Sequence, residues 1–178
     1  MAIQSLSREE LLDILAAARD KRERDFLMIL VAFAHGLRAT EVIQLTRKNF
    51  HDGHLIVQRL KGSQLTEQPL IEHENPLLNE KKFLSEYLLK LGPKERLFKV
   101  TRQRFWQLMQ EYGKAAGIAP HKRHPHTLKH SIGSQMIASA GIENTRQYLG
   151  HTTIASTGEY VKVSDEQASK AARHALGV

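Results

Sequence analysis

Side chains suited to cleaving a phosphodiester are spread along this chain and gather in its last quarter. The histidine-rich stretch HPHTLKHS occupies residues 124–131, and LGHTTIASTGEYV follows at 149–161. Cleaving a phosphodiester without water requires a nucleophile, cations for the non-bridging oxygens, and groups that remove and supply protons. We predict that these functions are provided by Arg38, Lys61, His126, Lys129, His151 and Tyr160.

The candidate nucleophile and its cation come from distant parts of the chain. Tyr160 offers a phenol oxygen, but a phenol with an ordinary pKa of about 10 is protonated at neutral pH and needs activation. Arg38, within HGLRATEV, has a planar guanidinium that can hold two phosphate oxygens. Glu41 and His130 are expected to orient the catalytic side chains beside them. A purely structural ion pair between Arg38 and Glu41 is the alternative interpretation.

The remaining candidates supply protons and positive charge. Lys61 lies in the turn of an expected hairpin, from which it can reach in and protonate a leaving oxygen. His126 and Lys129 are three residues apart, so they share one face of an expected helix. His151 follows Gly150, where the chain can turn and direct the imidazole.

Length and composition limit the class of protein. The chain, residues 1–178, suits one domain, and 41% of its residues are hydrophobic, enough for a core. It has no apolar run of about 18 residues that would span a membrane, and its N-terminal sequence lacks the apolar core of a signal peptide. The absence of cysteine excludes disulfides and favours the cytoplasm. The net charge of +7 favours a polyanionic partner such as nucleic acid.

The apolar periodicity predicts a mainly helical α+β fold. A capping box at Ser7 and Glu10 indicates a helix that starts near residue 8. Thr40 is the expected N-cap of a short helix that carries Glu41. Further helices are expected at about 21–35, 76–90, 102–116, 127–140, 143–149, 153–162 and 164–176.

One small antiparallel sheet completes the expected fold. Two strands are predicted at 54–60 and 64–71, and Asp52-Gly53 forms the turn before them. Pro69 cannot donate a backbone hydrogen bond, so the second strand is expected at an edge of the sheet.

Four segments give the chain a specific resemblance: HGLRATEV, RLKGS, HPHTLKHS and LGHTTIASTGEY. Together they carry the order arginine, lysine, histidine-x-x-basic residue, histidine and tyrosine. This order, and the spacing from the last histidine to the tyrosine, resemble the catalytic domain of the tyrosine recombinases, the phage integrase family. The resemblance covers nearly the whole chain, and HPHTLKHS is similar to the short fimbrial phase-variation invertases.

The resemblance implies a reaction and its partners. Tyr160 would attack one strand of double-stranded DNA, giving a 3′-phosphotyrosyl bond and a free 5′-hydroxyl. The ester stores the bond energy, so no ATP, metal or other cofactor is implied. Family members act as tetramers on two DNA sites. We expect a monomer in the absence of DNA, a cytoplasmic, nucleoid-associated location, and possible phage or mobile-element origin. The tail helix at about 164–176 would pack against a neighbouring subunit.

Two features depart from the family pattern. Lysine stands at position 129, where the family usually has arginine, and lysine lacks the bidentate fork. We therefore expect slower cleavage than in a Lys129→Arg variant, and a catalytically impaired DNA-binding member of the same fold is the alternative. We expect no counterpart here to the N-terminal helical domain that most members carry, so the chain is either a fragment of a longer protein or one of the short natural members. The chain alone is therefore expected to bind DNA weakly and with strong salt dependence.

Basic residues outside the catalytic set are candidates for contacts with DNA. Arg102 and Arg104 fall near the start of an expected helix, where the helix dipole favours a phosphate. A basic loop covers 120–125. The predicted DNA contacts are Arg47, Lys48, Arg102, Arg104, Lys122 and Arg123.

Two other functions compete with this interpretation. A metal-dependent hydrolase would use the clustered histidines His121, His124, His126 and His130. The chain, however, has no cysteine and no His-Glu-x-x-His motif, so no metal site is expected. A helix-turn-helix transcription factor could use the helices around 127–149, with Gly141 between them. That function explains neither Arg38 nor Lys61.

Overall fold

The fold is mainly helical with one small sheet, as predicted. The computed structural model describes residues 5–60, 63–158, 161 and 165–176. The α-helices in these ranges are α1 (Arg8–Lys21), α2 (Glu23–Ala34), α3 (Ala39–Gln44), α4 (Glu80–Leu89), α5 (Arg102–Ala115), α6 (Pro125–Leu149), α7 (Ala155–Gly158) and α8 (Asp165–Leu176). Short 3-10 helices are η1 (Arg47–Asn49), η2 (Pro76–Leu78) and η3 (Pro120–Lys122). The strands are β1 (Phe50–His51), β2 (His54–Gln58) and β3 (Leu65–Pro69).

Helix α2 forms the centre of the core. Its sequence is apolar on every side, and all residues from Asp25 to Ala34 are buried. Helices α1, α4 and α6 pack around it. The capping box predicted for α1 is present, because Ser7 accepts from the N–H of Glu10 and the Glu10 carboxylate accepts from the N–H of Ser7.

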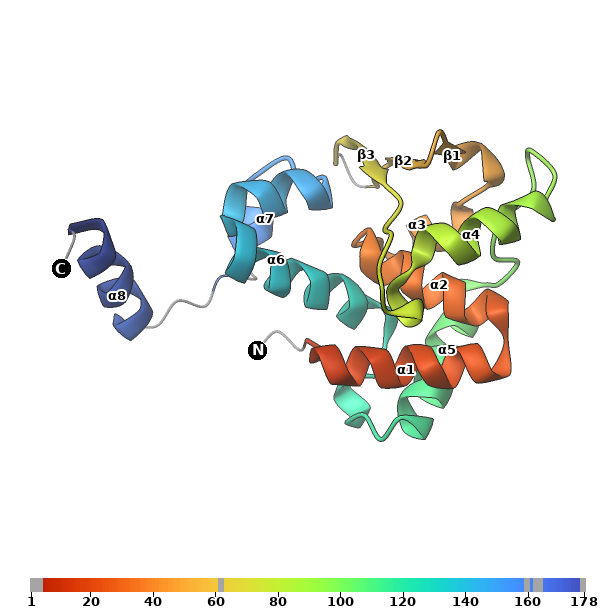
Figure 1. Ribbon diagram of the computed structural model, residues 1–178, viewed down its shortest axis with the longest axis horizontal. Coiled ribbons are helices and arrows are strands. Elements are labelled where there is room, and N and C mark those ends of the chain that lie inside the picture. The colour runs from red at the N-terminus through yellow and green to blue at the C-terminus, as the bar shows by residue number, and fades with distance from the viewer. Residues whose placement is uncertain (1–4, 61–62, 159–160, 162–164, 177–178) are drawn as a thin grey trace.

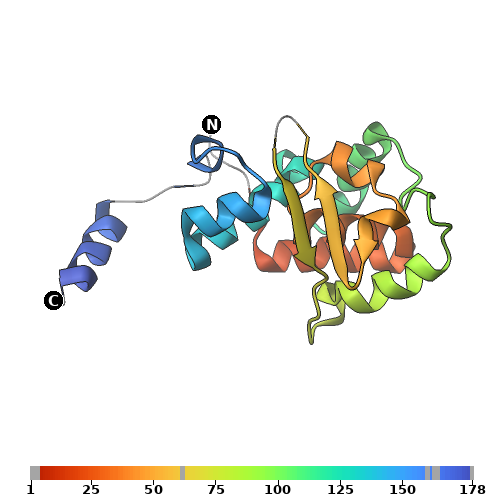
Figure 2. The same ribbon diagram turned by 90° about the horizontal axis from the view of Figure 1, so that it is seen from above.

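The sheet covers one side of this helical body (Figures 1 and 2). Its strands follow the order β1-β2-β3 and all pairs are antiparallel. Strand β3 is therefore an edge strand, and Pro69 at its end agrees with that prediction. Leu55 and Val57 of β2 point into the core. The start of β3 lies beside the C-terminal end of α6, because the backbone N–H of Gln64 donates a hydrogen bond to the Gly150 carbonyl.

Helix α6 carries the histidine-rich stretch and is interrupted once. Gly141 has φ 80° and ψ 174°, which divides α6 into two helical segments, as predicted for 127–140 and 143–149. Gly150 ends the helix in the left-handed conformation, with φ 69°. The chain therefore turns sharply just before His151.

The two helices after Gly150 differ in their attachment to the body. Helix α7 packs against α6. Helix α8, blue in Figure 1, stands apart from the body in both views. No described helix combines the length and the apolar character that crossing a membrane requires.

Several predicted boundaries were wrong in instructive ways. Strand β1 was not predicted, because two residues are too short to show an alternating pattern. The N-cap of α3 is Arg38 rather than Thr40. Asn75 caps only the 3-10 helix η2, and Asn79 caps α4 by accepting from the N–H of Lys82. Both predicted strands are shorter than expected, because their outer residues have no ladder partner.

Candidate active site

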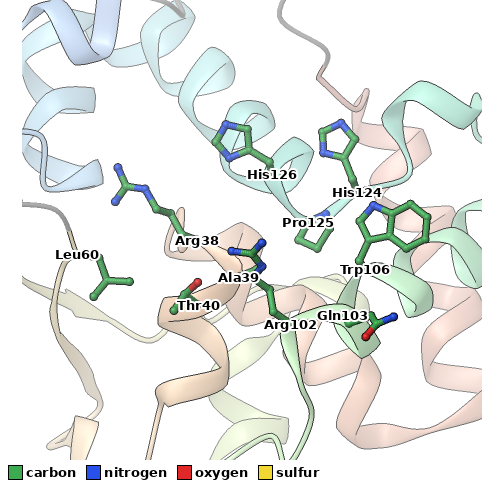
Figure 3. Close-up of a pocket in the computed structure, with 10 residues that line it drawn as sticks. All are labelled: Arg38, Ala39, Thr40, Leu60, Arg102, Gln103, Trp106, His124, Pro125 and His126. Carbon is green, nitrogen blue, oxygen red and sulfur yellow. The ribbon is translucent and has the colours of Figure 1, made fainter.

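A cleft of about 710 Å³ lies where α3, α5 and α6 begin. Its lining residues are Arg38, Ala39, Thr40, Leu60, Arg102, Gln103, Trp106, His124, Pro125 and His126. Figure 3 shows the guanidinium groups of Arg38 and Arg102 and the ring of His126 around one cleft, with Trp106 beside His124. Two cations that cannot be neutralised therefore share one concave surface, which suits an anionic group such as a phosphate.

Glu41 holds Arg38 in this cleft, a contact that both the catalytic interpretation and the structural ion pair predict. The Glu41 carboxylate accepts a bond from the backbone N–H of Arg38 at 2.7 Å and from its guanidinium at 3.1 Å. The side chain of Arg38 remains 28% exposed, whereas that of Glu41 is 1% exposed. Glu41 therefore fixes one edge of the guanidinium and leaves the rest of the fork facing the cleft.

Glu41 is an ionised carboxylate inside the protein. Burial alone would raise its pKa. Hydrogen bonds from the backbone N–H groups of Leu60 and Arg38, and the positive charges of Arg59 and Lys129, instead bring the pKa below its ordinary value. The charge on Glu41 is thus stabilised at neutral pH by the groups that it positions.

Lys129 lies beneath the cleft on α6. It is 1% exposed, and its positive charge is one of the causes that lower the pKa of Glu41. His126, one turn earlier, lines the cleft itself. The ring of His126 meets that of His130 edge-on, with 4.1 Å between centroids. The orienting role expected for His130 stays a prediction.

His151 is buried and held from two sides. Its Nδ1 lies 2.9 Å from the hydroxyl oxygen of Thr157 in α7. Its backbone carbonyl accepts a hydrogen bond from the guanidinium of Arg146 in α6. The left-handed turn at Gly150 places the imidazole between these two helices, 4% exposed. Two other predicted catalytic residues, Lys61 and Tyr160, lie outside the described residues.

The three described tyrosines all have structural partners. Tyr87 and Tyr148 donate their hydroxyl hydrogens to backbone carbonyls, and Tyr112 donates to the carboxylate of Asp25. Burial raises the pKa of Tyr148 to about 12, and burial also raises the pKa values of Tyr87 and Tyr112. All three phenols are therefore protonated at neutral pH and occupied by structural hydrogen bonds. Of the four tyrosines in the sequence, this leaves Tyr160 as the candidate nucleophile.

The predicted DNA contacts differ in their availability. Arg102 lines the cleft, and Lys48 is exposed. The other four basic residues already have partners within the fold. These partners are backbone carbonyls for Arg47 and Arg123, and the glutamates Glu111 and Glu10 for Arg104 and Lys122.

Some residues at the site were missed by the sequence interpretation. Trp106 is 51% exposed although it is a large apolar side chain, and it lines the cleft. Arg59 is 2% exposed and forms an ion pair with Glu41. The alternation of Leu55, Val57 and Arg59 along one strand face is the signal that could have identified Arg59 as buried.

The described residues do not form the ligand cluster that the metal-hydrolase alternative requires. Within the described ranges, no group of three or more histidine, aspartate or glutamate side chains is arranged to hold a metal ion. His124 instead lies within 3.2 Å of the Thr127 hydroxyl, and burial lowers its pKa. Of the clustered histidines, His124 and His126 line the cleft.

Comparison with known proteins agrees with this site. The model of the phage integrase family matches residues 4–167. The tyrosine recombinase XerA of Thermococcus onnurineus is 32% identical over 175 residues, which cover 94% of this chain and 61% of that protein. The tyrosine recombinase XerD of Haemophilus ducreyi is 31% identical over 173 residues, 90% of this chain and 58% of that protein.

A solved structure supports the fold independently of sequence. The XerH site-specific recombinase bound to difH substrate superimposes with a TM-score of 0.76 at 19% identity, over 96% of this chain and 54% of that one. The chain spans about three fifths of the length of the curated relatives it matches. Because the family model matches nearly the whole sequence, and the cleft holds the arginine and histidine of the family pattern, the chain belongs to the phage integrase family.

Proposed function

We propose that this chain is the catalytic domain of a site-specific DNA recombinase that cleaves and rejoins strands through a tyrosine. The observation that carries the proposal is a cleft lined by the partly exposed guanidinium of Arg38. The buried carboxylate of Glu41 holds that guanidinium in place. Family membership supports the same function. On this proposal the ligand of the cleft is the scissile phosphate of double-stranded DNA.

The proposed reaction exchanges one phosphate ester for another. The phenol oxygen of Tyr160 attacks phosphorus, and the bond from phosphorus to the 5′-oxygen breaks. Lys61 supplies the proton that the departing 5′-oxygen takes up, and His126, at the cleft, accepts the proton of the phenol. Arg38 holds the non-bridging oxygens as their charge grows. The product is a 3′-phosphotyrosyl bond, which the 5′-hydroxyl of a partner strand reverses without an external energy source.

We further propose the assembly and setting in which this reaction occurs. The chain, one catalytic domain with a tail helix, acts as a tetramer on two DNA sites and is a monomer without DNA. Helix α8 packs on a neighbouring subunit in that assembly, which its separate position supports (Figure 2). The expected DNA partner supports a cytoplasmic, nucleoid-associated location, and family membership supports a phage or mobile-element origin.

A nicked suicide substrate tests the proposed activity. Cleavage next to the nick releases a short oligonucleotide, so the covalent adduct accumulates and survives denaturation in SDS. The wild-type chain is expected to form the adduct, also in EDTA, and Tyr160→Phe is expected to form none. Tyr87→Phe is the matched control, because its hydroxyl is bonded to a backbone carbonyl. A wild-type chain that binds a cognate site but never forms the adduct would overturn the proposal.

A further inference from the structure

A buried arginine, Arg59, lies beneath the candidate site. Arg59 follows strand β2, and its side chain is completely inaccessible to solvent. An arginine remains charged in proteins, so burying it is costly unless its five N–H donors find acceptors. Burial lowers its pKa, and the charge of Glu41 opposes that effect. The acceptors of this guanidinium therefore show which segments Arg59 holds together.

The guanidinium reaches the ends of two helices. It donates to the carbonyl of His35 at 2.8 Å and to that of Gly36 at 3.2 Å, just after α2 ends. It also donates to the carbonyl of Tyr148 in the last turn of α6, at 3.4 Å. Carbonyls at a helix C-terminus lack intrahelical partners and form the negative end of the helix dipole. A cation between two such ends is well placed to satisfy both.

The same guanidinium also contacts the sheet and the carboxylate behind the cleft. Its Nε donates to the hydroxyl of Thr66 in β3 at 2.8 Å. Its Nη1 lies 3.5 Å from the carboxylate of Glu41, which holds Arg38. Glu41 in turn accepts from the backbone N–H of Leu60, directly after Arg59. Arg59 thus connects strand β3 to the Glu41 carboxylate, which in turn holds Arg38.

Gly150 shows how closely Arg59 packs against the turn before His151. A Cβ at Gly150 would lie 2.7 Å from Cγ of Arg59 and 3.0 Å from a methyl carbon of Thr66. The positive φ of Gly150, 69°, further disfavours any other residue. The backbone that aims His151 therefore rests directly on the Arg59 side chain.

We infer that Arg59 is a positioning residue, which fixes the segments carrying Arg38 and His151 relative to each other. Its contacts reach the turn before Arg38, the carboxylate that holds Arg38, and the turn before His151. The inference rests on the proposed function, because it concerns the geometry of that reaction. A lysine cannot replace the arginine, because one ammonium lacks the planar fork that reaches acceptors on several sides.

The test measures single-turnover cleavage of the suicide substrate at saturating DNA. Arg59→Lys is expected to lower the maximal rate about 100-fold, as for a displacement of about 1 Å among reacting groups. Affinity for DNA is expected to change about threefold or less, because Arg59 does not touch the ligand. Thr66→Val removes one acceptor of the guanidinium and keeps the test available if Arg59 variants do not fold. Its expected loss is about fivefold.

Tyr112→Phe is the matched control for a purely structural effect. It removes a buried hydrogen bond to Asp25, away from the cleft, and is expected to lower thermal stability but not the cleavage rate of the folded protein. If Arg59→Lys cleaves at the wild-type rate, or loses only as much as Tyr112→Phe at equal folded fraction, the inference is overturned.

A second readout separates this inference from the proposed function. Nuclear magnetic resonance of the Arg38 Nε–H group and of the His151 imidazole reports the positions of both groups without any reaction. Both signals are expected to shift in Arg59→Lys and to stay in place in Tyr112→Phe. If the wild-type chain forms no adduct, the proposed function fails, while unchanged signals in Arg59→Lys would separately overturn the positioning role.

Discussion

The charged residues beneath the cleft and the tail helix are built in opposite ways. Glu41, Arg59 and Lys129 are between 1% and 3% exposed and contact or charge-stabilise one another. The described side chains of α8 are all exposed, and the helix stands apart from the body (Figure 1). The charged residues of the first region are buried by other parts of the same chain. Helix α8 instead has an alanine-rich face on which no described residue of the chain packs. On the proposed function, this comparison predicts that the phosphate site forms before assembly and that the tail helix acts during assembly.

Removing the charge of Glu41 is expected to have the largest effect. Glu41→Gln should lower the free energy of unfolding by about 3 kcal/mol at pH 7, because it removes the carboxylate that pairs with the buried guanidinium of Arg59. Denaturant titration measures this change. Equal stability of variant and wild type at pH 7 would show that the buried cluster does not depend on this carboxylate.

The stability difference between wild type and Glu41→Gln is expected to depend on pH in a defined direction. Because the folded-state pKa of Glu41 lies below its ordinary value of 4.5, its contribution is fully present above pH 4.5 and is lost as the pH falls through the folded-state value. The stability difference between wild type and Glu41→Gln should therefore shrink only below pH 4.5. A difference that shrinks between pH 7 and 5 would contradict the lowered pKa.

Lys129→Arg is expected to produce the next largest effect, in opposite directions for rate and stability. A guanidinium adds about one charge-assisted hydrogen bond, so cleavage should rise about tenfold. Lys129 is fully buried, so the larger side chain should lower stability by about 1 kcal/mol through overpacking. Single-turnover cleavage and thermal unfolding measure the two effects. Cleavage equal to or slower than wild type would refute the prediction.

Thr157→Val tests the attachment of His151 to α7. The hydroxyl of Thr157 is 2.9 Å from Nδ1 of the imidazole, and losing this partner should slow cleavage about fivefold. Thr153→Val is the matched control, because Thr153 is exposed and its hydroxyl contacts Ser156. Similar rates for both variants would mean that Thr157 does not orient His151.

Removing α8 is expected to have the smallest effect on stability. A chain that ends before Asp165 should unfold within about 0.5 kcal/mol of wild type, because the side chains lost are exposed. Its assembly on two-site DNA should be lost, as measured by the size of the complex in sedimentation. A large loss of stability would mean that α8 belongs to the body, and intact assembly would mean that it is not the contact between subunits.

Local signals predicted most of the fold because they act within a few residues. The Ser7 capping box and the glycines at 141 and 150 all mark real helix ends. The wrong N-cap of α3 has a different cause. The Glu41 carboxylate accepts from the backbone N–H of Arg38 and is stabilised there by buried positive charges. The position of the N-cap therefore depends on tertiary structure.

The site was predicted only in part for the same reason. Arg38 and His126 line one cleft, and His151 lies in a separate buried position between α6 and α7. Lys61 and Tyr160 lie outside the described residues, so their roles stay predictions. Arg59 has no motif, because its importance arises from carbonyls that are 23 and 89 residues away.

Peptide mapping of the DNA adduct tests the central claim most directly. Wild-type chain trapped on a nicked site would be digested with trypsin and nuclease, and the peptide that carries a nucleotide would be sequenced by mass spectrometry. We predict a 3′-phosphate ester on Tyr160 and on no other tyrosine. A nucleotide on Tyr87, Tyr112 or Tyr148, or the absence of any linked peptide on a bound cognate site, would contradict it.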